Sequence, residues 1–101
     1  MSIEKKNDIS SILNYLEELI TNKKMNNTNI SYTERLLKGD LKKVIQKVGE
    51  ESNEVLIEAT LKNKERTIYE SADLIYHLLV MWNKLDITLY DIAQELERRK
   101  K

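Results

Sequence analysis

The chain has 101 residues, a size that favours a single domain, and we expect one all-α domain over residues 1–101. Its 17 Lys and Arg balance its 17 Asp and Glu, which argues against nucleic acid as a partner, because non-specific binding to it needs a cationic surface. The absence of Cys excludes disulfides, thiolate metal sites and a cysteine nucleophile. With no Pro and only two Gly, few residues interrupt a helix.

The sequence also argues against a membrane partner. The first residues, MSIEKKND, are polar, and the longest apolar run, residues 78–82, is far shorter than the roughly 20 residues that span a bilayer. We therefore expect a soluble, cytoplasmic protein. A chain this short buries only about 60–70% of its surface on its own, so oligomerisation would complete its core.

The first expected helix follows Asp8, a plausible N-cap. Its apolar stripe recurs at helical spacing and consists of Ile9, Ile12, Leu13, Leu16, Leu19 and Ile20. Residues 21–31 are rich in Asn, Thr and Ser, whose side chains compete with the backbone for hydrogen bonds, so we expect a loop there. Ser31-Tyr-Thr-Glu34 has the form of a capping box, which predicts a short helix ending near Gly39.

A longer helix should begin after Asp40 and run to about Leu61. Its apolar stripe consists of Leu41, Val44, Ile45, Val48, Val55, Leu56 and Ala59, with Ser52 between them. The polar residues 61–65 form the expected turn. A third helix then runs from about Glu65 to about Lys84.

Residues 74–82 of the third helix are apolar nearly all round, so we expect this helix to be buried on two sides. In so short a chain, the second side is expected to pack against another subunit. Thr88 and Asp91 form a variant of the capping box and open the last helix, which ends in the basic residues 98–101.

Acidic residues on the second helix lie beside its apolar stripe. Residues three apart are neighbours on a helix, and Glu51 and Glu54 form such a pair, which Glu58 extends by a turn. With a step of about 100° per residue, Glu51 lies about 70° from the middle of the stripe and Glu54 about 130°. These acids either form part of a site or belong to an ordinary charged face.

The third helix repeats this spacing in Glu70 and Asp73, directly before its apolar run. Burying a carboxylate without a partner costs several kcal/mol, so acids on so apolar a helix need cations. Lys or Arg from another helix could serve, and Arg66 is close in angle. His77 lies one turn after Asp73, as a general base or, more simply, as a group that hydrogen-bonds a carboxylate or as a core contact.

Together, two antiparallel helices would direct four carboxylates at one point. Four like charges do not converge unless a cation holds them. All-oxygen ligands in a chain with no Cys and a single His suit a hard ion, so the sequence favours Mg²⁺ or Mn²⁺ over Zn²⁺.

The same residues carry a resemblance to a known family. Glu50-Glu51-Ser-Asn-Glu54, fifteen further residues and Glu70-Ser-Ala-Asp73 resemble the EExxE…ExxD pattern of the MazG-like all-α nucleotide pyrophosphohydrolases. Three longer segments, SYTERLL from Ser31, KVGEE from Lys47 and DLIYHLLV from Asp73, resemble those of the phosphoribosyl-ATP pyrophosphohydrolases. The chain departs from this family by Ser52 in place of the usual Ala and by a loop without Pro before Ser31.

The resemblance implies Mg²⁺-dependent hydrolysis of 1-(5-phosphoribosyl)-ATP to phosphoribosyl-AMP and pyrophosphate, the second step of histidine biosynthesis. By matching motif positions, Glu51, Glu54, Glu70 and Asp73 would hold the ion, with Mn²⁺ as a possible substitute. Glu50 would bind a further ion or orient the attacking water, which makes Glu50 and Glu51 the candidate catalytic residues. The resemblance also implies a homodimer.

Three cations are candidates for binding the polyphosphate of the substrate: Lys47, Arg35 and Lys38. Lys47 belongs to the matched KVGEE segment, but it could instead form an ion pair along its own helix. Arg35 and Lys38 lie on the expected short helix, and a solvated face explains them nearly as well.

We therefore expect an all-α, four-helix-type subunit that dimerises into a larger helical bundle through its third helix. Two alternatives to the implied function remain open. One is a MazG-like house-cleaning enzyme that hydrolyses nucleoside triphosphates through the same acids. The other is a non-catalytic helical dimerisation module whose acids are solvated charge.

Overall fold

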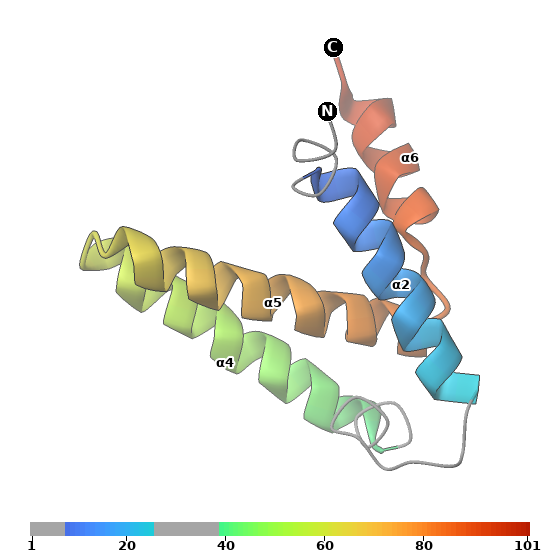
Figure 1. Ribbon diagram of the computed structural model, residues 1–101, viewed down its shortest axis with the longest axis horizontal. Helices are drawn as coiled ribbons and strands as arrows, with labels where there is room; N and C mark the ends of the chain where they lie inside the picture. The colour runs from blue at the N-terminus through green and yellow to red at the C-terminus, as the bar shows by residue number, and fades with distance from the viewer. Residues whose placement is uncertain (1–7, 26–38) are drawn as a thin grey trace.

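The computed structural model describes residues 8–25 and 39–101, which form four helices (Figure 1). These are α2 (Ile9–Met25), α4 (Leu41–Thr60), α5 (Lys64–Lys84) and α6 (Leu89–Arg99). The described residues contain no strand, so the all-α class predicted from the sequence is confirmed. The short helix expected after Ser31 lies outside the described residues.

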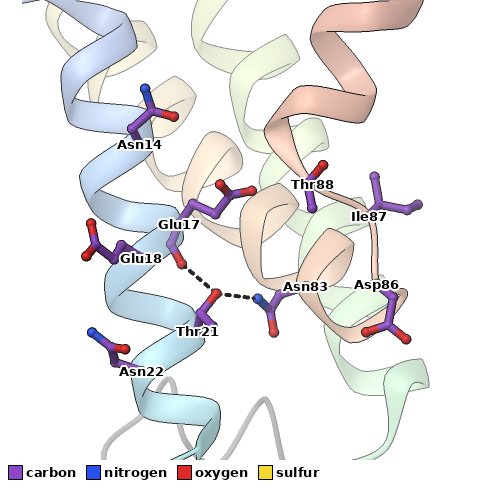
Figure 2. Close-up of a pocket in the computed structure, with 9 residues that line it drawn as sticks. All are labelled: Asn14, Glu17, Glu18, Thr21, Asn22, Asn83, Asp86, Ile87 and Thr88. Atoms are coloured by element: carbon purple, nitrogen blue, oxygen red, sulfur yellow. Dashed lines mark hydrogen bonds between the residues drawn. The ribbon is translucent and has the colours of Figure 1, made fainter.

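Helix α2 begins where the sequence predicts but continues past its expected end. Asp8 accepts hydrogen bonds from the Ser11 backbone N–H and hydroxyl, as an N-cap should. The loop predicted over residues 21–31 is wrong for residues 21–25, which are helical, and its remaining residues lie outside the described ones. The Thr21 hydroxyl donates to the Glu17 carbonyl at 2.9 Å and accepts from the Asn83 amide at 3.1 Å (Figure 2). With its hydrogen bonds made inside and across helices, Thr21 no longer competes with the α2 backbone.

Helices α4 and α5 lie side by side and antiparallel, joined by a tight turn (Figure 1). Both begin with a side-chain cap: Asp40 accepts from the Lys42 N–H, and Asn63 accepts from the Arg66 N–H. The predicted boundaries hold to within one residue at both ends of the turn. This arrangement matters for the site, because an antiparallel hairpin places the acids of α4 opposite those of α5.

The two turns that end α4 and α5 have the same backbone geometry. In the first, the Lys62 N–H donates to the Ala59 carbonyl and the Asn63 N–H to the Glu58 carbonyl. In the second, Asp86 and Ile87 repeat these bonds to the last turn of α5. This is the Schellman motif, which needs a left-handed residue after the helix. Lys62 and Asp86 both have φ of 58°, without the glycine that usually fills this position.

The core of the described chain is small and joins three helices. Its buried apolar residues are Ile20 from α2, Val44 from α4, and Leu79 and Val80 from α5. Helix α5 contacts both α4 and α2, but within residues 74–82 only His77, Leu79 and Val80 are buried and the other residues are half-buried. Part of the second side is covered by α2 of the same chain, whereas the sequence had suggested another subunit for it.

Helix α6 runs beside α2, and its start is fixed by two carboxylates (Figure 1). The predicted capping box of Thr88 and Asp91 is confirmed, with both reciprocal hydrogen bonds present. In addition, the Glu17 carboxylate of α2 accepts a hydrogen bond from the Leu89 N–H at 2.7 Å. A negative charge at a helix N-terminus is favourable, so this contact fastens α6 to α2.

A long-range contact also closes the open end of the α4–α5 hairpin. The Lys84 ammonium, in the last turn of α5, donates to the Gly39 carbonyl at 2.8 Å. Gly39 lies two residues before Leu41, the first residue of α4, so the hairpin is joined at its tip by the chain and near its base by this hydrogen bond.

The left-handed turn residue gives a stability prediction. Replacing Lys62 by Gly removes the Cβ that disfavours φ of 58°, so the free energy of unfolding should rise by about 0.5–1 kcal/mol. Urea unfolding at a fixed protein concentration measures this change. Lys62→Ala is the matched control, because it removes the charge but keeps the Cβ. Equal stabilities of the Gly and Ala variants would contradict the explanation.

Candidate metal centre on the α4–α5 hairpin

Three of the four acids predicted to converge lie together. Carboxylate oxygens of Glu51, Glu70 and Asp73 all lie within 4.8 Å of one another, and we name this group the acidic cluster. Glu51 comes from α4, while Glu70 and Asp73 are one turn apart on α5. Glu70 is buried and the other two are half-buried. Three convergent carboxylates form an all-oxygen donor set of the kind that Mg²⁺ and Mn²⁺ prefer.

Glu54 lies outside this group. Its side chain is exposed, although its residue stands opposite Glu70 in the register of the hairpin. It is nevertheless close enough to act on the charge of Glu70, as described next. The structure therefore brings together three of the four predicted ligands and leaves the fourth beside them.

The pKa of Glu70 is raised above its ordinary value of 4.5. Burial is the main cause, because it disfavours the charged form, and the negative charge of Glu51 is the next. Arg66 opposes these effects, while Glu54 and Asp73 add to them. The folded chain thus concentrates negative charge at a buried position, which a divalent cation would neutralise.

Arg66 is the cation of this site, as its angle on the third helix suggested. Its guanidinium lies 3.8 Å from the Glu70 carboxylate and 3.9 Å from that of Glu58 on the opposite helix. It also lies over the ring of Tyr69, 4.7 Å from the centroid. The half-exposed Arg66 therefore balances only part of the negative charge around it.

Glu50 and Lys47 pair with each other rather than with the acidic cluster. The Lys47 ammonium lies 3.6 Å from the Glu50 carboxylate, which also accepts a hydrogen bond from the Gln46 amide. The ion pair considered for Lys47 along its own helix is thus present, but with Glu50 and not with Glu51. Arg35 and Lys38 lie outside the described residues.

His77 is buried and bonded to the backbone of its own helix. Its Nδ1 lies 2.9 Å from the Asp73 carbonyl, which can only accept, so Nδ1 carries the hydrogen. This partner is a backbone carbonyl, whereas the sequence had suggested a carboxylate or a core contact. It links the position of the imidazole to the turn that bears Asp73.

A separate hollow of about 580 Å³ lies between α2 and the α5–α6 turn (Figure 2). Its lining is polar but not convergent. Figure 2 shows the Glu18 and Asn22 side chains directed away from α6, and the Glu17 carboxylate is already bound to the Leu89 N–H. We interpret it as the junction between α2 and α6, remote along α5 from the acidic cluster.

The fold and the acidic cluster define an all-α protein with a candidate divalent-metal centre on a helical hairpin. Residues 13–100 match the family described as phosphoribosyl-ATP pyrophosphohydrolase, so the chain belongs to this family of hydrolases. The family predicted from the sequence motifs is thereby confirmed.

Similar proteins cover the chain almost completely. A phosphoribosyl-ATP pyrophosphatase of Pyrobaculum aerophilum is 43% identical over 89% of this chain and 96% of its own length. The histidine biosynthesis bifunctional protein HisIE of Caldanaerobacter subterraneus is 45% identical over 97% of this chain but only 48% of its own length. The chain thus spans about half the length of such bifunctional relatives. Among the described residues, no helix is long and apolar enough to cross a bilayer.

Two contacts of Arg66 were not predicted from the sequence. Glu58 was placed in the row of acids, but its pairing with Arg66 across the hairpin depends on a register that one helix cannot reveal. The stacking of Arg66 on Tyr69, three residues later, has a signal in the helical i, i+3 spacing. An Arg and an aromatic residue at that spacing on a helix can form a cation–π contact.

The raised pKa of Glu70 gives a stability prediction for the metal-free chain. Near pH 7, ionised Glu70 costs the folded state free energy, whereas well below its ordinary value of 4.5 the carboxyl is protonated in both folded and unfolded chains. Glu70→Gln should therefore resist urea better than the wild type near pH 7 with EDTA present. The difference should shrink as the pH falls toward about 4.

Added Mg²⁺ should reverse this order by stabilising the wild type and not Glu70→Gln. Glu97→Gln, which changes an exposed acid on α6 and leaves the acidic cluster intact, is the control and should show the same dependence on pH and Mg²⁺ as the wild type. A Glu70→Gln variant less stable than the wild type near pH 7 without metal would contradict the assigned cause of the pKa shift.

Proposed function

We propose that this chain hydrolyses 1-(5-phosphoribosyl)-ATP to phosphoribosyl-AMP and pyrophosphate, with Mg²⁺ as its ion and Mn²⁺ as a substitute. The observation that supports this most directly is the convergence of Glu51, Glu70 and Asp73 from two helices. The family to which the chain belongs and the name of the Pyrobaculum relative supply the substrate. This reaction is the second step of histidine biosynthesis.

In this proposal the acidic cluster, with Glu54 beside it, holds the ion. Rotation of the exposed Glu54 side chain would add a fourth carboxylate to the three already gathered. Bound Mg²⁺ would neutralise phosphate charge and make a water molecule a better nucleophile. His77 would keep the turn of Asp73 in place through its bond to the Asp73 carbonyl.

Lys47 and Glu50, which form an ion pair on α4, would take separate roles when substrate binds. The Lys47 ammonium would leave Glu50 for a phosphate oxygen, since phosphate carries more charge than one carboxylate. Glu50 would then orient the attacking water and accept its proton, or bind a further ion. The water oxygen bonds to phosphorus as the bridging P–O bond between the α and β phosphates breaks, and pyrophosphate leaves. Arg35 and Lys38 are proposed as further phosphate contacts.

The proposed activity has a direct test. The purified chain should release pyrophosphate from phosphoribosyl-ATP when Mg²⁺ or Mn²⁺ is present and not with EDTA. Glu51→Gln, Glu70→Gln and Asp73→Asn should each lower kcat/KM by at least about 100-fold, since losing even an indirect partner of a metal ligand costs up to that much. Circular dichroism should show an unchanged helical content in each variant.

Two controls make this test specific. Glu97→Gln removes an exposed acid of α6 and should keep full activity. Deoxynucleoside triphosphates, offered at the same concentration, should be hydrolysed much more slowly than phosphoribosyl-ATP. The reverse order of rates would instead establish a house-cleaning enzyme, and full activity of the three acidic variants would refute the metal site.

We also propose that the chain works as a homodimer in the cytoplasm. Six of the exposed large apolar residues in the described part of the chain lie on the α4–α5 hairpin: Ile45, Leu56, Ile57, Leu61, Ile68 and Tyr69. Leu56, Ile57 and Leu61 line one hollow near the hairpin tip. Exposed apolar surface of this extent is typical of an interface. The cytoplasm is supported by the substrate, a highly charged nucleotide that cannot cross a bilayer unaided.

The dimer is tested by a matched pair of substitutions. Leu56 and Leu96 are exposed to the same degree, 64% and 63%, but lie on α4 and α6. Light scattering should give twice the monomer mass for the wild type and for Leu96→Lys, and a shift toward the monomer for Leu56→Lys, because a buried unpaired lysine opposes association. A wild type that stays monomeric at about 100 μM would refute the dimer, since stable interfaces bind more tightly than this.

A further inference from the structure

Arg66 is held beside the acidic cluster without being fully engaged by it. Its distances of 3.8 Å to Glu70 and 3.9 Å to Glu58 are ion-pair contacts, but both are longer than a hydrogen bond between nitrogen and oxygen. The guanidinium is positioned by the Tyr69 ring beneath it and by attraction to carboxylates on both helices. Its N–H donors are therefore not committed to either carboxylate in a bidentate pair.

The balance of charge around Arg66 changes when a cation binds. The guanidinium is within ion-pair distance of Glu58 and Glu70, and Glu70 is itself gathered with Glu51 and Asp73 in the acidic cluster. A divalent ion at the acidic cluster would offset two of these charges, which weakens the attraction of Glu70 for Arg66. A metal-bound phosphate would at the same time bring new negative charge to the rim, where the half-exposed guanidinium lies.

The location of Arg66 complements that of Lys47. In the antiparallel hairpin, Lys47 precedes Glu51 by one turn toward the open end, whereas Arg66 precedes Glu70 by one turn toward the tip. The two cations therefore bracket the acidic cluster along the hairpin axis. A chain of phosphates centred on the cluster would meet one cation on each side, and arginine is the side chain best shaped to bind phosphate oxygens in pairs.

We propose that Arg66 is a phosphate-binding residue, which exchanges Glu70 for an oxygen of a metal-bound diphosphate. This rests on the proposed function, because it requires a divalent ion at the acidic cluster. In the absence of metal, Arg66 balances part of the charge of Glu58 and Glu70. With metal present, its guanidinium holds the diphosphate group on the tip side of the cluster.

The test measures binding by calorimetry with Mg²⁺ alone and with inorganic pyrophosphate in the presence of Mg²⁺. For Arg66→Gln, the affinity for Mg²⁺ should equal or exceed that of the wild type, because a competing cation is gone. Its affinity for pyrophosphate should fall about tenfold, the effect of one charge-assisted contact. Arg66→Lys should recover part of this loss, since lysine keeps the charge but not the fork of donors.

Arg99→Gln is the matched control, because Arg99 also pairs with a glutamate but lies on α6. It should bind pyrophosphate as the wild type does. Equal pyrophosphate affinities of Arg66→Gln and Arg99→Gln would overturn the proposal and leave Arg66 a structural counter-ion. A parallel loss of Mg²⁺ affinity in Arg66→Gln would also overturn it, by showing that Arg66 acts through Glu70. A wild type that binds no Mg²⁺ would refute the proposed function itself.

Discussion

The repulsion among Glu51, Glu70 and Asp73 is the constraint on which the rest of this structure depends. Three carboxylates within 4.8 Å of one another oppose folding unless positive charge is near. The hairpin nevertheless holds them there through a core that lies along the same two helices, with Val44 and Val80 fully buried. Apolar packing thus stabilises an arrangement of charge that the acids alone would not adopt, which is the usual condition of a metal or active site.

Much of the fold could be predicted because its determinants are local. Asp8, Asp40 and the Thr88–Asp91 box mark helix starts by side-chain hydrogen bonds that depend only on nearby sequence. The end of α2 was misplaced at Thr21, whose hydroxyl bonds within its own helix and to Asn83, 62 residues away, a partner that the local sequence does not indicate. The left-handed Lys62 and Asp86 gave no signal either, since neither is the glycine expected there.

The candidate site, like the fold, could be predicted only where its geometry depends on one helix at a time. Helical spacing gave the pairs of acids on each helix, and the angle of Glu54, about 130° from the apolar stripe, agrees with its exposed position outside the acidic cluster. What one helix cannot specify is its partner's register. The ion pair of Arg66 with Glu58 depends on packing across the hairpin. The ion pair of Lys47 with Glu50, in place of Glu51, depends on the side-chain conformations along α4.

The bond between Lys84 and the Gly39 carbonyl has a mechanical consequence for this arrangement. The chain joins α4 and α5 at residues 61–63, and this hydrogen bond joins them at the opposite end of the hairpin. Separation of the two helices would break this hydrogen bond and the core contacts beside it. This hydrogen bond and the core therefore oppose separation of the two helices, so the backbone around the acids is partly preorganised for an ion.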